Sequence, residues 1–213
     1  MRRMIDVTEQ ISAVRRQVGA RTLESGEARI VTVSQSYGVP LDDLWDACTD
    51  AERISRWFLP CSGELKAGGH YELAGNASGT VTRCDPPQGF DATWEYGGEV
   101  SWIEVRLTPE SPGRTQFRLD HIAHVDDARW LEFGPGAVGV GWDSGLLGLA
   151  QHLATGKSMD PAEGQAWAAS PEGKRFMTLS SESWRAASVE AGTDPAEAKE
   201  AADRTTAAYT GAS

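Results

Sequence analysis

The sequence predicts an α+β fold, in which a curved antiparallel sheet of about six to seven strands surrounds one long helix. Two observations predict it. Residues 62–121 consist of short alternating runs separated by turn residues, as is typical of strands joined by hairpins. Residues 134–156 carry apolar side chains at three- and four-residue steps, as is typical of an amphipathic helix. A meander followed by one long helix favours a sheet with the helix on one face.

The long helix has one apolar face and an unusual number of glycines. The apolar face consists of Val138, Trp142, Leu146, Leu149, Ala150 and Leu153. Gly139, Gly141, Gly145 and Gly148 interrupt the segment, and each costs about 0.5–1 kcal/mol relative to alanine. Their missing side chains therefore serve either close approach of a neighbouring element or room for a ligand. We expect close packing first, because glycine is more often a packing residue than a cavity wall.

The elements before the meander are read from periodicity and capping signals. Met4–Val18 has helical spacing and predicts a short docking helix, and residues 30–37 alternate as a strand. Pro40, followed by two aspartates, suits a helix start, and Thr49–Glu52 forms a capping box that begins a second short helix ending near Phe58. The sequence therefore predicts two short helices directly after the first strand.

Within the meander, the period of two assigns side chains to faces. The six runs are residues 63–66, 70–74, 79–84, 90–96, 99–107 and 114–121. We expect the face toward the long helix to carry Phe90, Ala92, Trp94, Tyr96, Ile103, Val105, Leu107, Phe117, Leu119 and His121. Trp102 falls on the opposite face, where an exposed indole would form an apolar patch, so we expect a terminal segment to cover it.

The chain continues past the long helix with further helices. Residues 122–135 read as a loop, whereas Asp160-Pro161, Ser170-Pro171 and Asp194-Pro195 are helix-start signals. The predicted organisation is an N-terminal docking helix and linker at 1–26, a main domain at 27–156, and a helical extension at 157–213 packed on that domain.

Composition excludes several classes of function. The net charge is −11 without a basic run, which argues against nucleic acid and anionic membrane surfaces as partners. No apolar run approaches the roughly 18 residues of a membrane span. Three cysteines without paired spacing, and the lack of an apolar signal core, predict free thiols in the cytoplasm.

An ordered series of landmarks resembles a known superfamily. Val39–Phe58 reads Val-Pro-x-x-x-Leu-Trp-x-Ala-x-Thr-Asp-x-Glu-x-x-x-x-Trp-Phe, and Thr93–Glu95, Arg106–His121 and Gly141-Trp142 follow in order. Over about residues 27–155 this resembles the START-like, helix-grip superfamily (SRPBCC). Within it, the chain is similar to the branch of polyketide cyclases and the heat-shock ATPase activator. The chain departs from the family pattern at Val39, where a small polar cap is usual, and at Ile122–His124, where a glycine is common.

The resemblance implies an apolar cavity between the sheet and the long helix. The candidate ligand-binding residues are Trp57, Tyr71, Trp94, Tyr96, Phe117, His121, Trp142 and Leu146. For most of the aromatic residues among them, plain core packing is the competing interpretation. His121 is the one candidate for proton donation to a ligand carbonyl, against the alternative of a hydrogen-bonded histidine at the sheet edge.

Other chemistry finds little support in the sequence. His121 and His124 are three residues apart on a strand and point to opposite faces, so we expect no metal site and no cofactor. The glycine-rich stretch from Gly134 lacks the Lys-Ser/Thr ending of a phosphate loop, and no serine lies in a Gly-x-Ser-x-Gly elbow.

The function expected from these observations is binding of an apolar or aromatic small molecule. One alternative is a protein interaction module like the chaperone cofactor, with a role in stress response; another is an enzyme like a polyketide cyclase or dehydratase. We expect binding rather than catalysis, because His121 has no second polar residue beside it in the pattern. The expected partners are a small hydrophobic molecule and, in the alternatives, a chaperone or a second copy in a homodimer.

Overall fold

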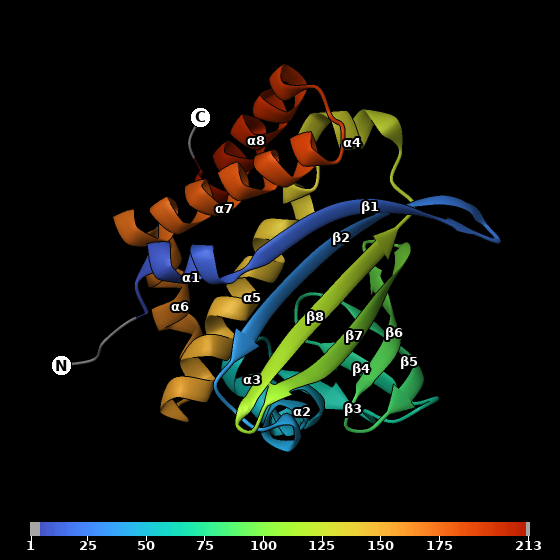
Figure 1. The fold of residues 1–213 in the computed structure, drawn as a ribbon, viewed down its shortest axis with the longest axis vertical. Helices are drawn as coiled ribbons and strands as arrows, with labels where there is room; N and C mark the ends of the chain where they lie inside the picture. Colours follow the sequence, from blue (N-terminus) through green and yellow to red (C-terminus); the bar gives the residue numbers. More distant parts are fainter. Residues whose placement is uncertain (1–4, 212–213) are drawn as a thin grey trace. The chain divides into compact units, whose positions relative to one another are not determined.

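The structure, a computed structural model, describes residues 5–211 and has the predicted α+β class. It contains one open antiparallel sheet of eight strands and, within the described residues, eight helices, consistent with the helix-grip fold (Figure 1). The chain divides into two compact units. Of the described residues, the first comprises 5–33, 124–147 and 159–211, and the second comprises 34–123 and 148–158.

The second unit is built on a meander. Its strands are β3 (Cys61–Gly63), β4 (His70–Leu73), β5 (Ser78–Asp85), β6 (Gly89–Tyr96), β7 (Glu99–Ser111) and β8 (Arg114–Ala123). Each pairs antiparallel with the next along the chain, because short turns connect them. The unit also contains α2 (Leu41–Thr49) and α3 (Ala51–Trp57), and Asp50 caps α3 by accepting from the Arg53 amide. The two short helices predicted before the meander are present.

The strand register of the second unit separates two faces of its sheet. Ile103 lies opposite Ala92 and His121, Val105 opposite Phe90 and Leu119, and Leu107 opposite Phe117. The central members are buried, and we call this side the apolar face. The alternate positions carry charged residues on the polar face, among them Asp91, Glu104, Arg106, Arg118 and Asp120. The predicted sharing of faces is therefore reproduced by the register.

The first unit is mostly helical. It contains α1 (Val7–Ala13), β1 (Arg15–Leu23), most of β2 (Gly26–Tyr37), α4 (Asp127–Phe133) and the first half of α5 (Gly136–Thr155). The C-terminal helices α6 (Pro161–Ala169), α7 (Pro171–Glu190) and α8 (Pro195–Thr210) complete it. Asp160, Ser170 and Asp194 cap these three helices, each accepting from backbone amides of the first turn. The three predicted starts are confirmed.

Two elements differ from the sequence-based expectation. The N-terminal helix ends at Ala13, and Arg15–Leu23 forms a strand that pairs with β2, which is why the sheet has eight strands rather than six or seven. The apolar spacing of residues 4–18 predicted a helix there, and it could not show that β2 lies beside Arg15–Leu23 as a pairing strand. The predicted start at Met4 lies outside the described residues. The expected loop at 122–135 contains α4, which begins where Asp126 accepts from the Arg129 amide.

The glycines of α5 have a packing reason at Gly139. A Cβ there would overlap the indole ring of Trp184 on α7. At Gly141, by contrast, a Cβ would lie at an ordinary distance of 3.6 Å from the Tyr209 hydroxyl. Gly139 thus lets α7 approach α5 closely. Among residues 5–211, no helix combines the length and apolar character that crossing a membrane requires.

Candidate functional site

The eight predicted ligand-binding residues are distributed over both units. Trp142 and Leu146 belong to the first unit, as part of α5. The second unit contains the other six: Trp57, Tyr71, Trp94, Tyr96, Phe117 and His121. Within the second unit, the structure brings Trp94 and His121 together, with ring centroids 6.1 Å apart and planes inclined by 56°. This pair is the centre of the candidate site.

His121 is held by a serine on the neighbouring strand. Its Nε2 lies 2.8 Å from Ser101 Oγ, and the same hydroxyl lies 3.1 Å from the carbonyl oxygen of Trp94. A hydroxyl has one hydrogen and a carbonyl can only accept, so Ser101 donates to Trp94 and accepts from His121. The imidazole therefore carries its hydrogen on Nε2. Strand pairing produces this arrangement. Ser101 on β7 lies opposite Trp94 on β6, and Ile103, two residues further along β7 on the same face, lies opposite His121 on β8.

Burial keeps the His121 ring neutral. The residue is only 6% exposed, and this desolvation lowers the pKa of His121 to about 4. At neutral pH the site therefore offers an uncharged imidazole beside an indole. Ser101 is not set up as a nucleophile, because its hydrogen points to a carbonyl and the neighbouring ring nitrogen is a donor.

Tyr71 supports the strand that carries Trp94. Its buried side chain on β4 donates from the hydroxyl to the Thr93 carbonyl oxygen at 2.6 Å. Burial first, and then the charge of Glu95, raises the pKa of Tyr71, so the phenol stays protonated. Tyr71 faces Gly79 in the register, where a Cβ would overlap the Thr93 carbonyl. The glycine thus allows β4, β5 and β6 to approach closely beside the candidate site.

The remaining predicted residues of the second unit have other surroundings. Trp57 donates from Nε1 to the Ala47 carbonyl at 2.9 Å and so joins α3 to α2. Phe117 is 4% exposed and packs in the core opposite Leu107. Tyr96 ends β6 and is 61% exposed.

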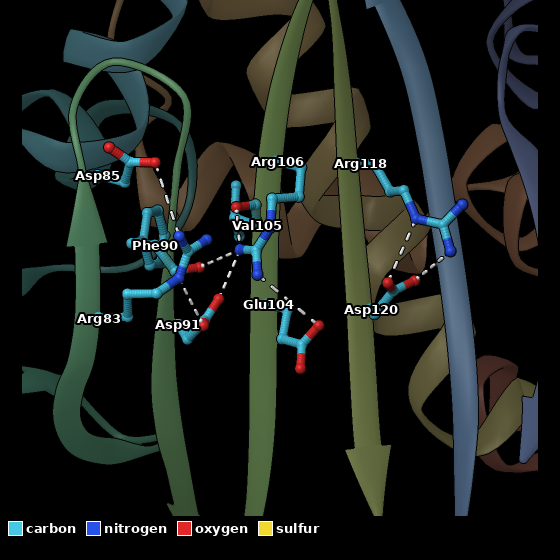
Figure 2. A network of polar contacts seen from close by, with 9 residues as sticks. All are labelled: Arg83, Asp85, Phe90, Asp91, Glu104, Val105, Arg106, Arg118 and Asp120. Carbon is cyan, nitrogen blue, oxygen red and sulfur yellow. Dashed lines mark hydrogen bonds and ion pairs between the residues drawn. The ribbon is translucent and has the colours of Figure 1, made fainter. Parts of the chain in front are cut away.

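Sequence reasoning missed Ser101 and the charged residues of the polar face. Ser101 had a usable signal, because it shares the period-two face of Ile103, Val105 and Leu107. On the polar face, Asp91 accepts from Arg83 Nε at 2.9 Å and Arg106 Nη1 at 2.5 Å (Figure 2). Arg118 pairs with Asp120 at 3.0 Å on β8. The two Asp91 contacts join β5, β6 and β7, and they depend on the register that no local pattern reveals.

The site has no constellation of metal ligands. In the part of the chain that the structure describes, no group of three histidine, cysteine or carboxylate side chains could hold a metal ion. His124 belongs to the first unit, where its Nδ1 lies 2.9 Å from the Glu27 carbonyl and its Nε2 lies 2.8 Å from Ser25 Oγ. Because a carbonyl accepts, Nδ1 of His124 is the donor in the first of these contacts.

Comparisons with known proteins agree with this architecture. Residues 38–154 match the model of a family described as Activator of Hsp90 ATPase homolog 1-like protein. The crystal structure of CalU16 from Micromonospora echinospora is 36% identical, with 82% of this chain and 98% of that chain covered, at a TM-score of 0.66. Its solution structure is also 36% identical, covers 85% of this chain and 97% of that chain, and gives a TM-score of 0.69.

A more distant structure shares the fold. DynU16, a protein of the dynemicin biosynthetic locus, is 22% identical, with 61% of this chain and 48% of that chain covered, at a TM-score of 0.53. At that identity the likeness concerns the fold alone. A search of curated proteins gives no match.

Proposed function

Because the chain belongs to the family of Activator of Hsp90 ATPase homolog 1-like proteins, within the polyketide-cyclase-like SRPBCC superfamily, we propose that it binds an apolar or aromatic small molecule. The ligand lies against the apolar face of the second unit, beside Trp94, Ser101 and His121. Trp94 and His121 are two of the predicted candidates, and Ser101 lies on the strand between them.

The observation that carries this proposal is the neutral imidazole in an otherwise apolar row. His121 follows Phe117 and Leu119 on the same face of β8 and is as deeply buried as they are. Burying a polar ring costs free energy unless hydrogen bonds compensate, and an aliphatic residue would fill the row at no such cost. A mostly apolar surface with a few positioned polar groups is the usual composition of a small-molecule site.

The pair also indicates how a ligand is oriented. An aromatic ring can stack against Trp94, whose indole already inclines toward His121. A ligand hydroxyl can then donate to Ser101 Oγ, which keeps one lone pair after accepting from His121, while the remaining contacts are apolar. The proposed ligand class is therefore a planar, largely apolar molecule that carries one or a few oxygens.

Calorimetric titration of the full chain with a hydroxylated naphthalene, an anthraquinone, a sterol and a fatty acid tests this proposal. We expect saturable binding of the aromatic compounds. Trp94→Leu should weaken it at least fivefold, since a stacking contact of about 1 kcal/mol is lost. The matched control is Trp102→Leu, which alters an indole at the next register pair on the opposite face. Equal loss in both variants, or no saturable binding of any compound, would contradict the proposal.

The neutral state of His121 favours binding over catalysis of a cyclisation. A general acid is most effective when its pKa lies near the working pH, whereas the pKa of His121 is about 4. The neutral imidazole N–H still holds the Ser101 oxygen in position without transferring a proton. Conversion of a linear poly-β-ketone substrate to a cyclic product, lost in His121→Gln, would instead establish the enzymatic alternative.

A second candidate function is binding to a chaperone ATPase of the Hsp90 type. The family's description favours it, and the polar face offers a charged surface of β5, β6 and β7 for such a partner. We expect purified Hsp90 to be retained by the immobilised chain and its ATPase rate to rise. Arg106→Glu should reduce both effects, whereas Arg114→Glu, a charge change at the first residue of β8, should not. Absence of retention by the unaltered chain would rule this candidate out.

The remaining proposal is that the chain binds a second copy of itself. A homodimer that uses residues 157–213 would elute from a sizing column at twice the mass of one chain. Light scattering across a hundredfold range of concentration distinguishes it from the monomer, whose mass is 22.9 kDa.

A further inference from the structure

The helices of the first unit enclose a small hollow. It lies among α4, the start of α5, α7 and α8, and its volume is about 20 Å³. Its walls are largely apolar, formed by Trp130, Phe133, Pro135, Trp184, Ala198 and Ala201. Figure 1 shows α7 and α8, two of the helices that line it, running side by side. We call this space the helical hollow.

One buried hydroxyl in the wall lacks a hydrogen-bond partner. Ser181 on α7 lines the helical hollow, is 1% exposed, and its Oγ is one of the buried unpartnered atoms found in residues 5–211. A helical serine usually donates to the carbonyl four residues earlier, as Ser144 does to Val140. Nearby polar groups are already paired, since Ser188 donates to Thr193 and Arg185 donates to Glu182. Ser181 thus offers the hollow an uncommitted donor.

The charges around the helical hollow favour an uncharged ligand with an accepting oxygen. Gly136, the first residue of the 20-residue helix α5, lines the hollow, and a helix start favours negative partial charge. Glu197 lines the same space and would repel a full anion, while the Arg185 charge is engaged by Glu182 at 2.8 Å. A carbonyl oxygen meets the helix start and Ser181 without adding a charge.

The size of the helical hollow limits what enters. A single water needs roughly 10–15 Å³ of such space, so about 20 Å³ admits a carbonyl with an adjoining methyl group. The rest of a ligand must extend outward, where Leu131 of α4 lines the rim and is 52% exposed. We propose that the helical hollow is a second binding site, which takes the methyl-ketone end of a small uncharged apolar molecule through Ser181. This site goes beyond the proposed function, whose residues belong to the second unit.

Methyl NMR of the full chain, labelled with ¹³C at alanine methyls, tests this assignment directly. Ala198, Ala201 and Ala202 line the helical hollow and serve as reporters. The probes are acetophenone, its isostere α-methylstyrene, which has C=CH₂ in place of C=O, and benzoate. We expect saturable shifts of the three methyls with acetophenone, at least tenfold weaker binding of the isostere, and none with benzoate.

Two serine variants separate the site from general stability. Ser181→Ala removes a hydroxyl without a partner, so the fold should keep its stability while acetophenone binds about three- to tenfold more weakly. Ser180→Ala is the neighbouring control: it removes a hydrogen bond to Asp143 and should lower stability without changing acetophenone affinity. Trp94→Leu should leave these methyl shifts unchanged, which distinguishes failure here from failure of the proposed function. Absent shifts, or equal affinity in Ser181→Ala and the unaltered chain, would overturn the assignment.

Discussion

Asp143 is a buried carboxylate of the first unit, and three donors surround one of its oxygens. Its Oδ2 accepts from Arg16 Nε at 2.9 Å, from Ser180 Oγ at 2.5 Å and from Trp184 Nε1 at 3.1 Å. Burial raises the pKa of Asp143, against the opposing effects of the Arg16 charge and these hydrogen bonds. Arg16 also donates from Nη1 to the Ile11 and Val14 carbonyls at the end of α1. One ion pair therefore joins α1, β1, α5 and α7.

Removing the carboxylate should destabilise the protein strongly. In Asp143→Asn the guanidinium of Arg16, 6% exposed in the native protein, loses its counter-charge, which costs about 3–5 kcal/mol in buried pairs. Urea unfolding at pH 7 measures this loss. The double variant Arg16→Met/Asp143→Leu removes both charges and should recover most of the stability. A single variant within 1 kcal/mol of the unaltered protein would show that the pair contributes little.

Two glycines of α5 offer a matched comparison. Gly139→Ala forces the indole of Trp184 to move and should cost about 1–3 kcal/mol, as overpacking does. Gly141→Ala meets only an ordinary contact with Tyr209 and should gain about 0.5–1 kcal/mol from helix propensity. Thermal unfolding of both variants gives the sign of each change. The same sign for both would refute the packing explanation.

At the scale of elements, α8 supplies the polar groups that close the end of α4. Arg204 donates to the carbonyls of Leu131 and Glu132, and Thr205 donates to that of Phe133 at 2.9 Å. The last carbonyls of a helix have no partner within it. α4 is only seven residues long, so its end depends on these contacts from α8.

Thr205→Val tests that dependence. The change keeps the shape but leaves the Phe133 carbonyl without its donor in a site where Thr205 is 1% exposed, so we expect a loss of about 1–3 kcal/mol. Amide exchange in α4 should accelerate as well. Thr206→Val makes the same chemical change at the next, partly exposed position and should stay within about 0.5 kcal/mol. Unchanged exchange in α4 after Thr205→Val would refute the role of α8.

At the scale of the whole molecule, His121 makes stability depend on pH. The unfolded chain takes up a proton near pH 6.5, whereas the folded protein, with a pKa of about 4, does not. Burial of this histidine therefore leaves the free energy of unfolding unchanged well above pH 6.5 and lowers it as the pH drops toward 4. The raised pKa of Asp143 has the opposite sign, because the folded state takes up that proton more readily than the unfolded chain does.

Urea unfolding at pH 7 and pH 5 measures the histidine effect. Between these values the unaltered protein should lose about 2 kcal/mol more than His121→Gln, which has no proton to take up. His152→Gln is a control that changes another buried histidine. If the two pH dependences of the unaltered protein and His121→Gln coincide, His121 is not held neutral by the fold.

The sequence alone determined the class and most elements, because these depend on neighbouring residues. The alternation of Phe117, Leu119 and His121 fixes a strand face, and Asp160, Ser170 and Asp194 start helices through their own first turns. Short turns between strands allow only antiparallel neighbours. These rules also placed Trp94 and His121 on one face before the register was known.

Tertiary structure decided what local patterns cannot encode. Arg15–Leu23 is a strand because β2 lies beside it, and Asp143 meets Arg16 across 127 positions of sequence. Ser101 reaches His121 across 20 positions, through the register of β7 and β8. The unpartnered hydroxyl of Ser181 likewise emerges only once four helices enclose it. Such contacts depend on which segments meet after folding, and the sequence around each residue does not identify its partner.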